Sequence, residues 1–316
     1  MNKTSALAAA VCRGPSLRCV AALLCCWLAP WTAYGEPVAI TFDDLPLNGT
    51  LAPGTTRVGI VTDVLAVLKQ HAVPQVYGFV NAKKLEGSPD GAEALKLWVA
   101  GGQRVGNHTY AHSDLSGETA DAFLQDVRLN EPALELLTAG DTWRWFRYPY
   151  LREGDALEKR RAVRTQLASR NYQIAQVTLD YEDYLWNSAY ARCAAKHDDQ
   201  SVARLHESYL SIASAYIDAD REMAKAVFGR EVSHVLLLHL GAYSSKILPD
   251  VLELLHQKGF TLVTLEEAQR DPIYQSDPDA GSKQGGTLLE QWMDTRRIKY
   301  PTVLRKPYKE LEAICL

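Results

Sequence analysis

The sequence has no excess of basic residues and no basic stripe. Its 316 residues include 34 Lys and Arg against 38 Asp and Glu, which gives a formal net charge of −4. Three of the basic residues (Lys3, Arg13 and Arg18) lie before Glu36 in a segment without acids, so the rest of the chain is the more acidic part. Such a chain has little electrostatic attraction for nucleic acid or anionic lipid. We therefore expect no nucleic-acid partner.

Long apolar runs are also missing. The run Cys19–Leu28 is shorter than the ~20 residues that a membrane span needs. It follows a basic stretch ending at Arg18 and precedes Ala33-Tyr34-Gly35, which has small residues at the two positions that a signal peptidase reads. We predict a signal peptide over residues 1–35, with an uncleaved anchor as the second interpretation. The prediction implies export to the periplasm or the medium, and no stable membrane span after cleavage.

Cysteine is scarce outside this leader. Cys193 and Cys315 are the two cysteines of the remaining chain, and neither lies in a metal-type spacing. An oxidising compartment would let them pair if the fold brings them together, but their separation in sequence does not decide this.

Several catalytic motifs are absent as well. The sequence contains no Gly-x-Ser-x-Gly nucleophile elbow, no His-Glu-x-x-His helix and no Gly-x-x-x-x-Gly-Lys phosphate loop. These absences argue against a serine esterase, a zincin protease and a P-loop nucleotide enzyme.

From Pro37 onward, short apolar segments alternate with amphipathic ones, which is typical of an α/β fold with a largely parallel sheet. We predict strands at 38–42, 75–80, 104–107, 144–147, 173–178, 234–239 and 261–264. We predict helices at 57–71, 91–100, 119–137, 155–170, 201–228 and 245–258. The pattern fits a closed or nearly closed β/α barrel, and it also fits a doubly wound open sheet.

Two histidines and two aspartates are the strongest chemical signal. His108 and His112 are four residues apart, a spacing that on a helical turn would let them share one metal ion. Asp43 and Asp44 follow the first predicted strand, at the end of a parallel sheet where sites assemble. One Asp with two His makes a three-ligand metal site with open positions, and the other Asp can act as a general base. Either pair alone would more often be a surface or capping feature, so the inference depends on their combination.

Further polar residues follow three later strands. Arg147 and Tyr150 flank a Pro turn, Asp180 begins an acidic cluster, and His239 ends the apolar run Leu236–Leu238. Convergence of these groups on one rim of the sheet indicates a single site.

The ordered motifs resemble those of a known family. Thr-Phe-Asp-Asp, His-x3-His, Arg-x-Pro-Tyr, Asp-x-x-Asp and Leu-x-His resemble the five motifs of the polysaccharide deacetylases, carbohydrate esterase family 4, with their NodB-like homology domain. The resemblance runs from about Val38 to Val263. It implies an α/β fold of the distorted (β/α)7 barrel type, and a metal-dependent hydrolase that removes acetyl groups from a poly- or oligosaccharide.

The resemblance also implies individual roles. Asp44, His108 and His112 would hold a divalent metal ion, most often Zn²⁺, with Co²⁺ and other divalent ions as alternatives. Asp43 would be the base, and Arg147 would orient it.

Four further residues would act on the substrate side. His239 would protonate the leaving group, and Asp180 would tune the pKa of His239. A backbone N–H near Tyr150 would polarise the acetyl carbonyl, and Leu237 would line the pocket for the methyl group. The chain departs from the family pattern at Tyr184, where Trp is common.

With this resemblance, we predict three parts of the chain: a signal peptide at 1–35, a deacetylase catalytic domain at 36–270 and a C-terminal extension at 271–316 that packs on or trails the domain. Residues 180–203 are expected to form a long loop, in which Trp186 and Tyr190 are either core residues or platforms for a sugar ring.

The first choice of substrate is an N-acetylated polymer such as peptidoglycan or a chitin-like chain. O-Deacetylation of a xylan-type polymer and a catalytically silent carbohydrate-binding relative are the alternatives. A silent relative is expected to lose a metal ligand, the base or the acid, whereas all of these are present.

Overall fold

The computed structural model describes residues 35–316, so the predicted signal peptide lies outside the described residues except for Gly35. The strands are β1 (Glu36–Asn48), β2 (Tyr77–Val80), β3 (Arg104–Asn107), β4 (Trp145–Phe146), β5 (Gln173–Ile174), β6 (His234–Gly241) and β7 (Phe260–Leu262). The α-helices are α1 (Arg57–Gln70), α2 (Pro89–Ala100), α3 (Ala120–Leu137), α4 (Leu157–Ser169), α5 (Tyr184–Ala195), α6 (Asp199–Phe228), α7 (Ser244–Gln257), α8 (Leu265–Ala268), α9 (Leu288–Arg296) and α10 (Tyr308–Ala313). The predicted strands and helices are confirmed, with shifted ends.

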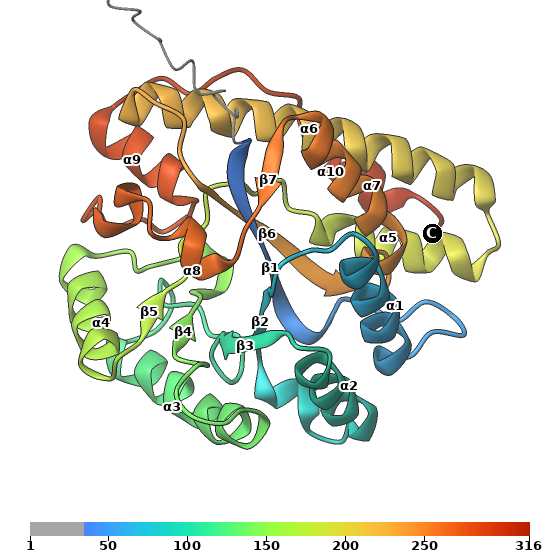
Figure 1. Cartoon of the computed structure of the whole chain (residues 1–316), viewed down its shortest axis with the longest axis horizontal. Helices are drawn as coiled ribbons and strands as arrows, with labels where there is room; N and C mark the ends of the chain where they lie inside the picture. Colours follow the sequence, from blue (N-terminus) through green and yellow to red (C-terminus); the bar gives the residue numbers. More distant parts are fainter. Residues whose placement is uncertain (1–34) are drawn as a thin grey trace, which may run out of the picture. The chain divides into compact units, whose positions relative to one another are not determined.

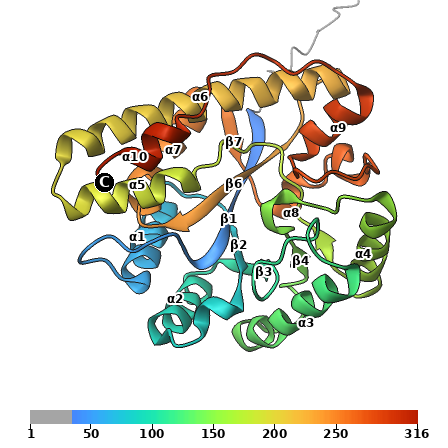
Figure 2. The same ribbon diagram turned by 180° about the vertical axis from the view of Figure 1, so that it is seen from behind.

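The strands form one parallel sheet that curls into a barrel. Their order is β5-β4-β3-β2-β1-β6, and β7 pairs with the beginning of β1. Just past β5, Leu179 forms a parallel bridge with Leu236 of β6, which brings the two edges of the sheet together. The helices surround the strands in both views (Figures 1 and 2). Of the two predicted architectures, the barrel is therefore the one observed.

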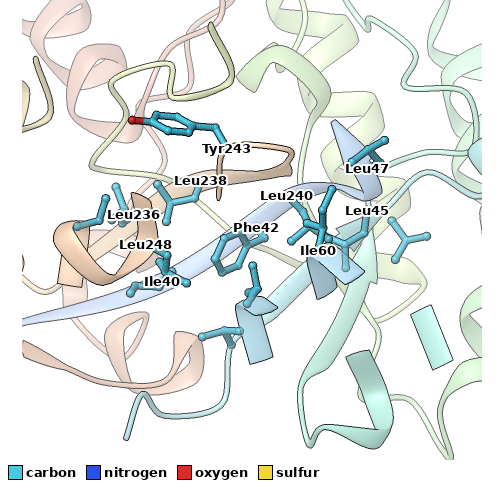
Figure 3. Packing of buried hydrophobic residues seen from close by; sticks show 14 of the residues in the cluster. Ile40, Phe42, Leu45, Leu47, Ile60, Leu236, Leu238, Leu240, Tyr243 and Leu248 are labelled. Carbon is cyan, nitrogen blue, oxygen red and sulfur yellow. The ribbon is translucent and has the colours of Figure 1, made fainter. Parts of the chain in front are cut away.

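Side chains along β1 point alternately outward, to the core between the sheet and the helices, and inward, to the interior of the barrel. Ile40 and Phe42 pack with Leu236 and Leu238 of β6 against the surrounding helices, as Figure 3 shows. The intervening Ala39 belongs to a second cluster of interior side chains. Successive strand residues point to opposite faces. The polar residues that follow Ala39 at every second position of β1 therefore point into the barrel, as Ala39 does.

The helices begin where short polar side chains cap them. Thr56 accepts from Gly59 N before α1, and Thr119 accepts from Ala122 N before α3. At the end of α6, Gly229 has a φ of 70°, the left-handed conformation that glycine adopts at low cost and that stops a helix. These local signals agree with the predicted helix positions.

The prediction of a long loop at 180–203 is wrong. Residues 184–195 form α5, whose buried face packs on α6. Trp186 is fully buried and donates to Ser208 Oγ, and Tyr190 stacks on Tyr243. Trp186 is therefore a core residue, and Tyr190 is a partly buried residue that packs against the core.

The last part of the chain folds back on the barrel. Helix α9 packs on α6 and α10 packs on α5. Cys193 of α5 and Cys315 form a disulfide, so the fold does bring the two cysteines together. Across residues 35–316, no helix is both long and apolar enough to cross a membrane.

Candidate active site

Asp43 and Asp44 lie within β1, beside β6, and not after the strand as predicted, because β1 continues to Asn48. Asp43 is in register with His239 of β6, and both aspartates are buried. Asp44 has a φ of 69°, in the left-handed region that short polar residues tolerate better than others. Because the backbone leaves the extended conformation at Asp44, the two adjacent carboxylates contact different side chains.

The ligand atoms of Asp44, His108 and His112 all lie within 4.8 Å of one another. His112 Nε2 is 3.5 Å from Asp44 Oδ1. His108 Nδ1 is 2.8 Å from the carbonyl oxygen of Arg147, a contact that assigns the proton to Nδ1 and leaves the Nε2 lone pair for a ligand. The three residues thus form a cluster that can hold a metal ion.

The two histidines do not lie on a helical turn, which corrects the prediction from their spacing. They occupy the loop after β3, where Thr109 and His112 both have a φ of 60°. Left-handed residues interrupt a helix, and here they fold the loop so that the two imidazole centroids are 4.9 Å apart.

The charges of the cluster suit metal ligation. Burial lowers the pKa of His108 to about 3 and that of His112 to about 4, so both imidazoles are neutral at neutral pH. Burial alone would raise the pKa of Asp44, but the charge of the Lys84 ammonium holds it well below its usual range. A carboxylate and two neutral imidazoles are the protonation states that bind a divalent cation.

Lys84 is a contact that sequence reasoning missed. It lies in a short 3-10 helix after β2 (Ala82–Leu85), and its Nζ is 2.9 Å from Asp44 Oδ1 as an ion pair. That approach is outside hydrogen-bond geometry, and Asp44 Oδ1 accepts no hydrogen bond. No motif in the sequence marks this lysine, because its role depends on where the β2–α2 connection lies.

Arg147 holds Asp43 from inside the barrel. Its Nη1 is 3.1 and 3.3 Å from the two carboxylate oxygens, its Nη2 donates to Thr41 Oγ1, and its Nε donates to the Ala175 carbonyl. The guanidinium also lies over the Phe79 ring. Burial raises the pKa of Asp43, and the Arg147 charge opposes that rise. The structure therefore places Arg147 where it was expected to orient Asp43.

The carboxylate that contacts His239 is Asp183, and not the predicted Asp180. Asp183 Oδ1 is 2.6 Å from His239 Nδ1, and Oδ2 accepts from the His239 backbone N–H. Burial alone would lower the pKa of His239, but the Asp183 pair reverses this and raises it to about 9. His239 is therefore an imidazolium at neutral pH.

Asp180 has a different environment. Its Oδ1 accepts from the backbone N–H of Glu182 at 2.7 Å, and the side chain lines the pocket. Burial raises its pKa to about 6. In the sequence, Asp180 and Asp183 are equally good candidates for the carboxylate that contacts His239. Glu182, which lies between them, has a φ of 58°, and this turn makes the two side chains point in different directions.

These groups surround one pocket of about 320 Å³. It is lined by Asp43, Asp44, Asn48, His108, His112, Tyr150, Leu151, Arg152, Asp180, Glu182, Tyr184, Leu237, His239 and Gln284. The structure thus brings all the predicted site residues to this pocket except Arg147, which lies beneath Asp43.

Two exposed tyrosines flank the pocket. Tyr150, with a φ of 58°, stands edge-on to His112 with ring centroids 4.4 Å apart. Tyr184 stands edge-on to His239 at 5.2 Å. Leu237, by contrast, is buried. The site therefore has aromatic side chains at its mouth and an aliphatic side chain in its wall.

Curated proteins with similar sequences include two deacetylases. The chitin deacetylase of Arthroderma benhamiae is 26% identical over 147 residues, which is 46% of this chain and 35% of that protein. The peptidoglycan-N-acetylglucosamine deacetylase of Bacillus cereus is 30% identical over 152 residues, 48% of each chain. The chain thus spans half or less of the length of these curated relatives.

A solved structure shares the fold. The chitin deacetylase of the fungal pathogen Colletotrichum lindemuthianum aligns with a TM-score of 0.51 and 22% identity, over 75% of this chain and 88% of that one. The predicted distorted (β/α)7 barrel is confirmed by this likeness and by the parallel barrel itself. The family model described as polysaccharide deacetylase matches residues 32–174. By that match, the first part of the barrel is similar to the polysaccharide deacetylases.

Proposed function

We propose that this protein is a metal-dependent deacetylase of an N-acetylated poly- or oligosaccharide. The observation that carries the proposal is the pocket itself, which holds a three-ligand cluster, a carboxylate base and a protonated imidazole. A catalytically silent carbohydrate-binding protein would have no use for all three. The names of the related chitin and peptidoglycan deacetylases support the same substrate class.

Asp44, His108 and His112 would hold the metal ion. The fit is supported by the donor set, a carboxylate and two imidazoles whose ligand atoms lie within 4.8 Å of one another, and by the His108 tautomer that the Arg147 carbonyl fixes. Bound there, a divalent ion would polarise the acetyl carbonyl and make a water more acidic. The donor set suits Zn²⁺, and it accepts Co²⁺ and other divalent ions.

Asp43 and His239 divide the proton transfers. Asp43 would take a proton from the attacking water, and Arg147 keeps the carboxylate oriented for this step. Water oxygen bonds to the acetyl carbon, the carbon–nitrogen bond breaks, and acetate leaves. His239 would give its proton to the departing nitrogen, so that the sugar is released as an amine.

Two residues would shape the acyl site. A backbone N–H near Tyr150 would donate to the developing oxyanion, and the buried Leu237 would contact the acetyl methyl. The same groups can serve an ester, so O-deacetylation of a xylan-type polymer is the second candidate.

The proposal is tested by acetate release from chain 36–316, measured with N-acetylglucosamine oligomers, peptidoglycan strands and acetylated xylan. We expect release from the N-acetylated substrates, its loss with a chelator and its return with Zn²⁺ or Co²⁺. Faster release from xylan would favour the ester reaction. No release from any substrate, with a metal bound stoichiometrically, would reject the proposed function.

Replacing Asp183 by Asn is expected to shift the alkaline limb of the pH dependence of kcat to lower pH. The Asp183 carboxylate raises the pKa of His239 to about 9, so the acid stays protonated up to that region. Without the carboxylate the imidazolium loses its stabilising charge, its pKa falls, and the active fraction declines at a lower pH. A metal ion bound at Asp44 would itself lower the pKa of His239, so the prediction is the direction of the shift.

The matched control is Asp180→Asn. Asp180 makes no contact with the His239 ring, so its replacement should move the limb less. The assignment of Asp183 is wrong if only Asp180→Asn shifts the limb in a series of kcat measurements between pH 6 and pH 10.

We also propose that the protein acts outside the cytoplasm. The Cys193–Cys315 disulfide supports this, because disulfides persist in the periplasm and outside the cell and are rare in the cytoplasm. The predicted leader points to the same compartments.

A further inference from the structure

The C-terminal segment, residues 299–316, is fastened to α5. Cys315 forms its disulfide with Cys193, and Arg192 Nε donates to the Ile314 carbonyl at 3.2 Å. The C-terminus lies beside α5 in both views (Figures 1 and 2). The segment therefore follows a fixed path along the helix that comes directly after the acidic cluster of the active site.

Lys306 and Tyr308 of the C-terminal segment both bind Glu182. Lys306 Nζ lies 3.2 Å from Glu182 Oε1, and Tyr308 Oη donates to Oε2 at 2.6 Å. The ammonium also lies 4.3 Å from the ring centroid of Tyr216 in α6, and the Lys306 side chain is only 8% exposed. A cation so well buried needs a compensating negative charge, and Glu182 supplies it.

Glu182 is at the same time part of the pocket wall. It lines the pocket together with Asp180, Tyr184 and His239, on a turn where its own N–H donates to Asp180 Oδ1. An ionised carboxylate has about four lone-pair sites. The two contacts from the C-terminal segment thus fix the side chain and leave acceptor capacity for a ligand.

We propose that the C-terminal segment completes the substrate-binding site by fixing Glu182 as a specificity-determining residue, which accepts hydrogen bonds from hydroxyl or amino groups of the sugar chain. This inference rests on the proposed deacetylase function. Glu182 and Asp180 on this wall accept hydrogen bonds when ionised, and they repel a carboxylate. The substrate class is therefore a chain of neutral or amino sugars, and a sugar with an acidic substituent is disfavoured on this side of the pocket.

The first test is Glu182→Gln with an N-acetylglucosamine tetramer as substrate. Losing a charged acceptor is expected to raise KM about 10-fold and to change kcat no more than about 2-fold, because binding and not chemistry is affected. The preference for this neutral tetramer over strands that alternate N-acetylglucosamine with N-acetylmuramic acid should fall in E182Q. The reason is that the repulsion of the muramic carboxylate is removed.

The second test acts on the C-terminal segment. Lys306→Met and Tyr308→Phe each remove one contact to Glu182, and both should raise KM for the tetramer, while Lys306→Arg should restore most of the affinity. Lys309→Met is the matched control, because Lys309 is an exposed residue of α10 with no hydrogen bond or ion pair to Glu182. Thermal unfolding midpoints show whether each variant keeps the fold.

The outcomes separate this inference from the function on which it rests. If the wild-type chain releases acetate from the tetramer and E182Q, K306M and Y308F leave KM unchanged, the inference is overturned and the function stands. It is also overturned if E182Q keeps the wild-type preference for the neutral chain. If the wild-type chain releases acetate from no glycan, the proposed function fails first and the inference falls with it.

Discussion

Asp43→Asn is expected to lower kcat for acetate release by roughly 10²- to 10⁴-fold, the contribution of a general base. The amide cannot accept the proton of the attacking water. Its oxygen can still accept a hydrogen bond from Arg147, which now approaches the carboxylate at 3.1 Å. The metal cluster does not include Asp43, so the variant should bind a divalent ion with the wild-type stoichiometry.

Metal content and kcat measured on the same sample separate the two aspartates. Asp44→Asn should lose both the metal and the activity, whereas Asp43→Asn should lose the activity alone. Asp63→Asn, at an exposed site on α1, is the control for a change of one surface carboxylate and should affect neither. Loss of the metal in Asp43→Asn would show that the roles of the two residues are exchanged.

The site residues that can be predicted from the sequence are those whose positions are set by strand geometry. Asp43, Leu237 and His239 all follow from the alternation of parallel strands, which sends every second residue of β1 and β6 to the barrel interior. His108 and His112 were paired correctly for the wrong reason, because a loop with two left-handed residues, and not a helix, brings them together.

The assignments that failed or were missed depend on turns and on distant segments. Asp180 and Asp183 are both compatible with the strand end, and the left-handed turn at Glu182 decides which of them faces His239. Lys84 reaches Asp44 from the connection after β2, and Lys306 reaches Glu182 from far along the chain. Such contacts arise from tertiary packing, and no local period in the sequence records them.

Helix α5 was missed for a related reason. Its sequence mixes Trp, Tyr and Ala with one charged residue, Arg192, and its buried face includes Asn187 as well as apolar side chains. Asn187 Oδ1 accepts from the Tyr243 N–H, and its Nδ2 donates to Asn48. A polar residue that is satisfied only by distant partners weakens the apolar periodicity by which an amphipathic helix is identified.

His112→Ala is expected to abolish stoichiometric metal binding and to lower kcat/KM by about 10³-fold or more, because several kcal/mol of transition-state stabilisation depend on the metal. His112 is the least buried member of the cluster, with 22% of its side chain exposed, so its loss should disturb the fold less than that of His108. His108 is fully buried and also bonds the Arg147 carbonyl, which makes its removal a less selective test.

His256→Ala is the matched control, because His256 is exposed on α7 and does not line the active-site pocket. Its metal content, activity and unfolding midpoint should equal those of the wild-type chain. Added Zn²⁺ should not restore His112→Ala at concentrations that restore the chelated wild type, since a two-ligand site holds the ion far more weakly. Full activity in His112→Ala, insensitive to chelator, would mean that hydrolysis needs no metal at this cluster. The Asp43 carboxylate and the His239 imidazolium would then have to carry the whole reaction.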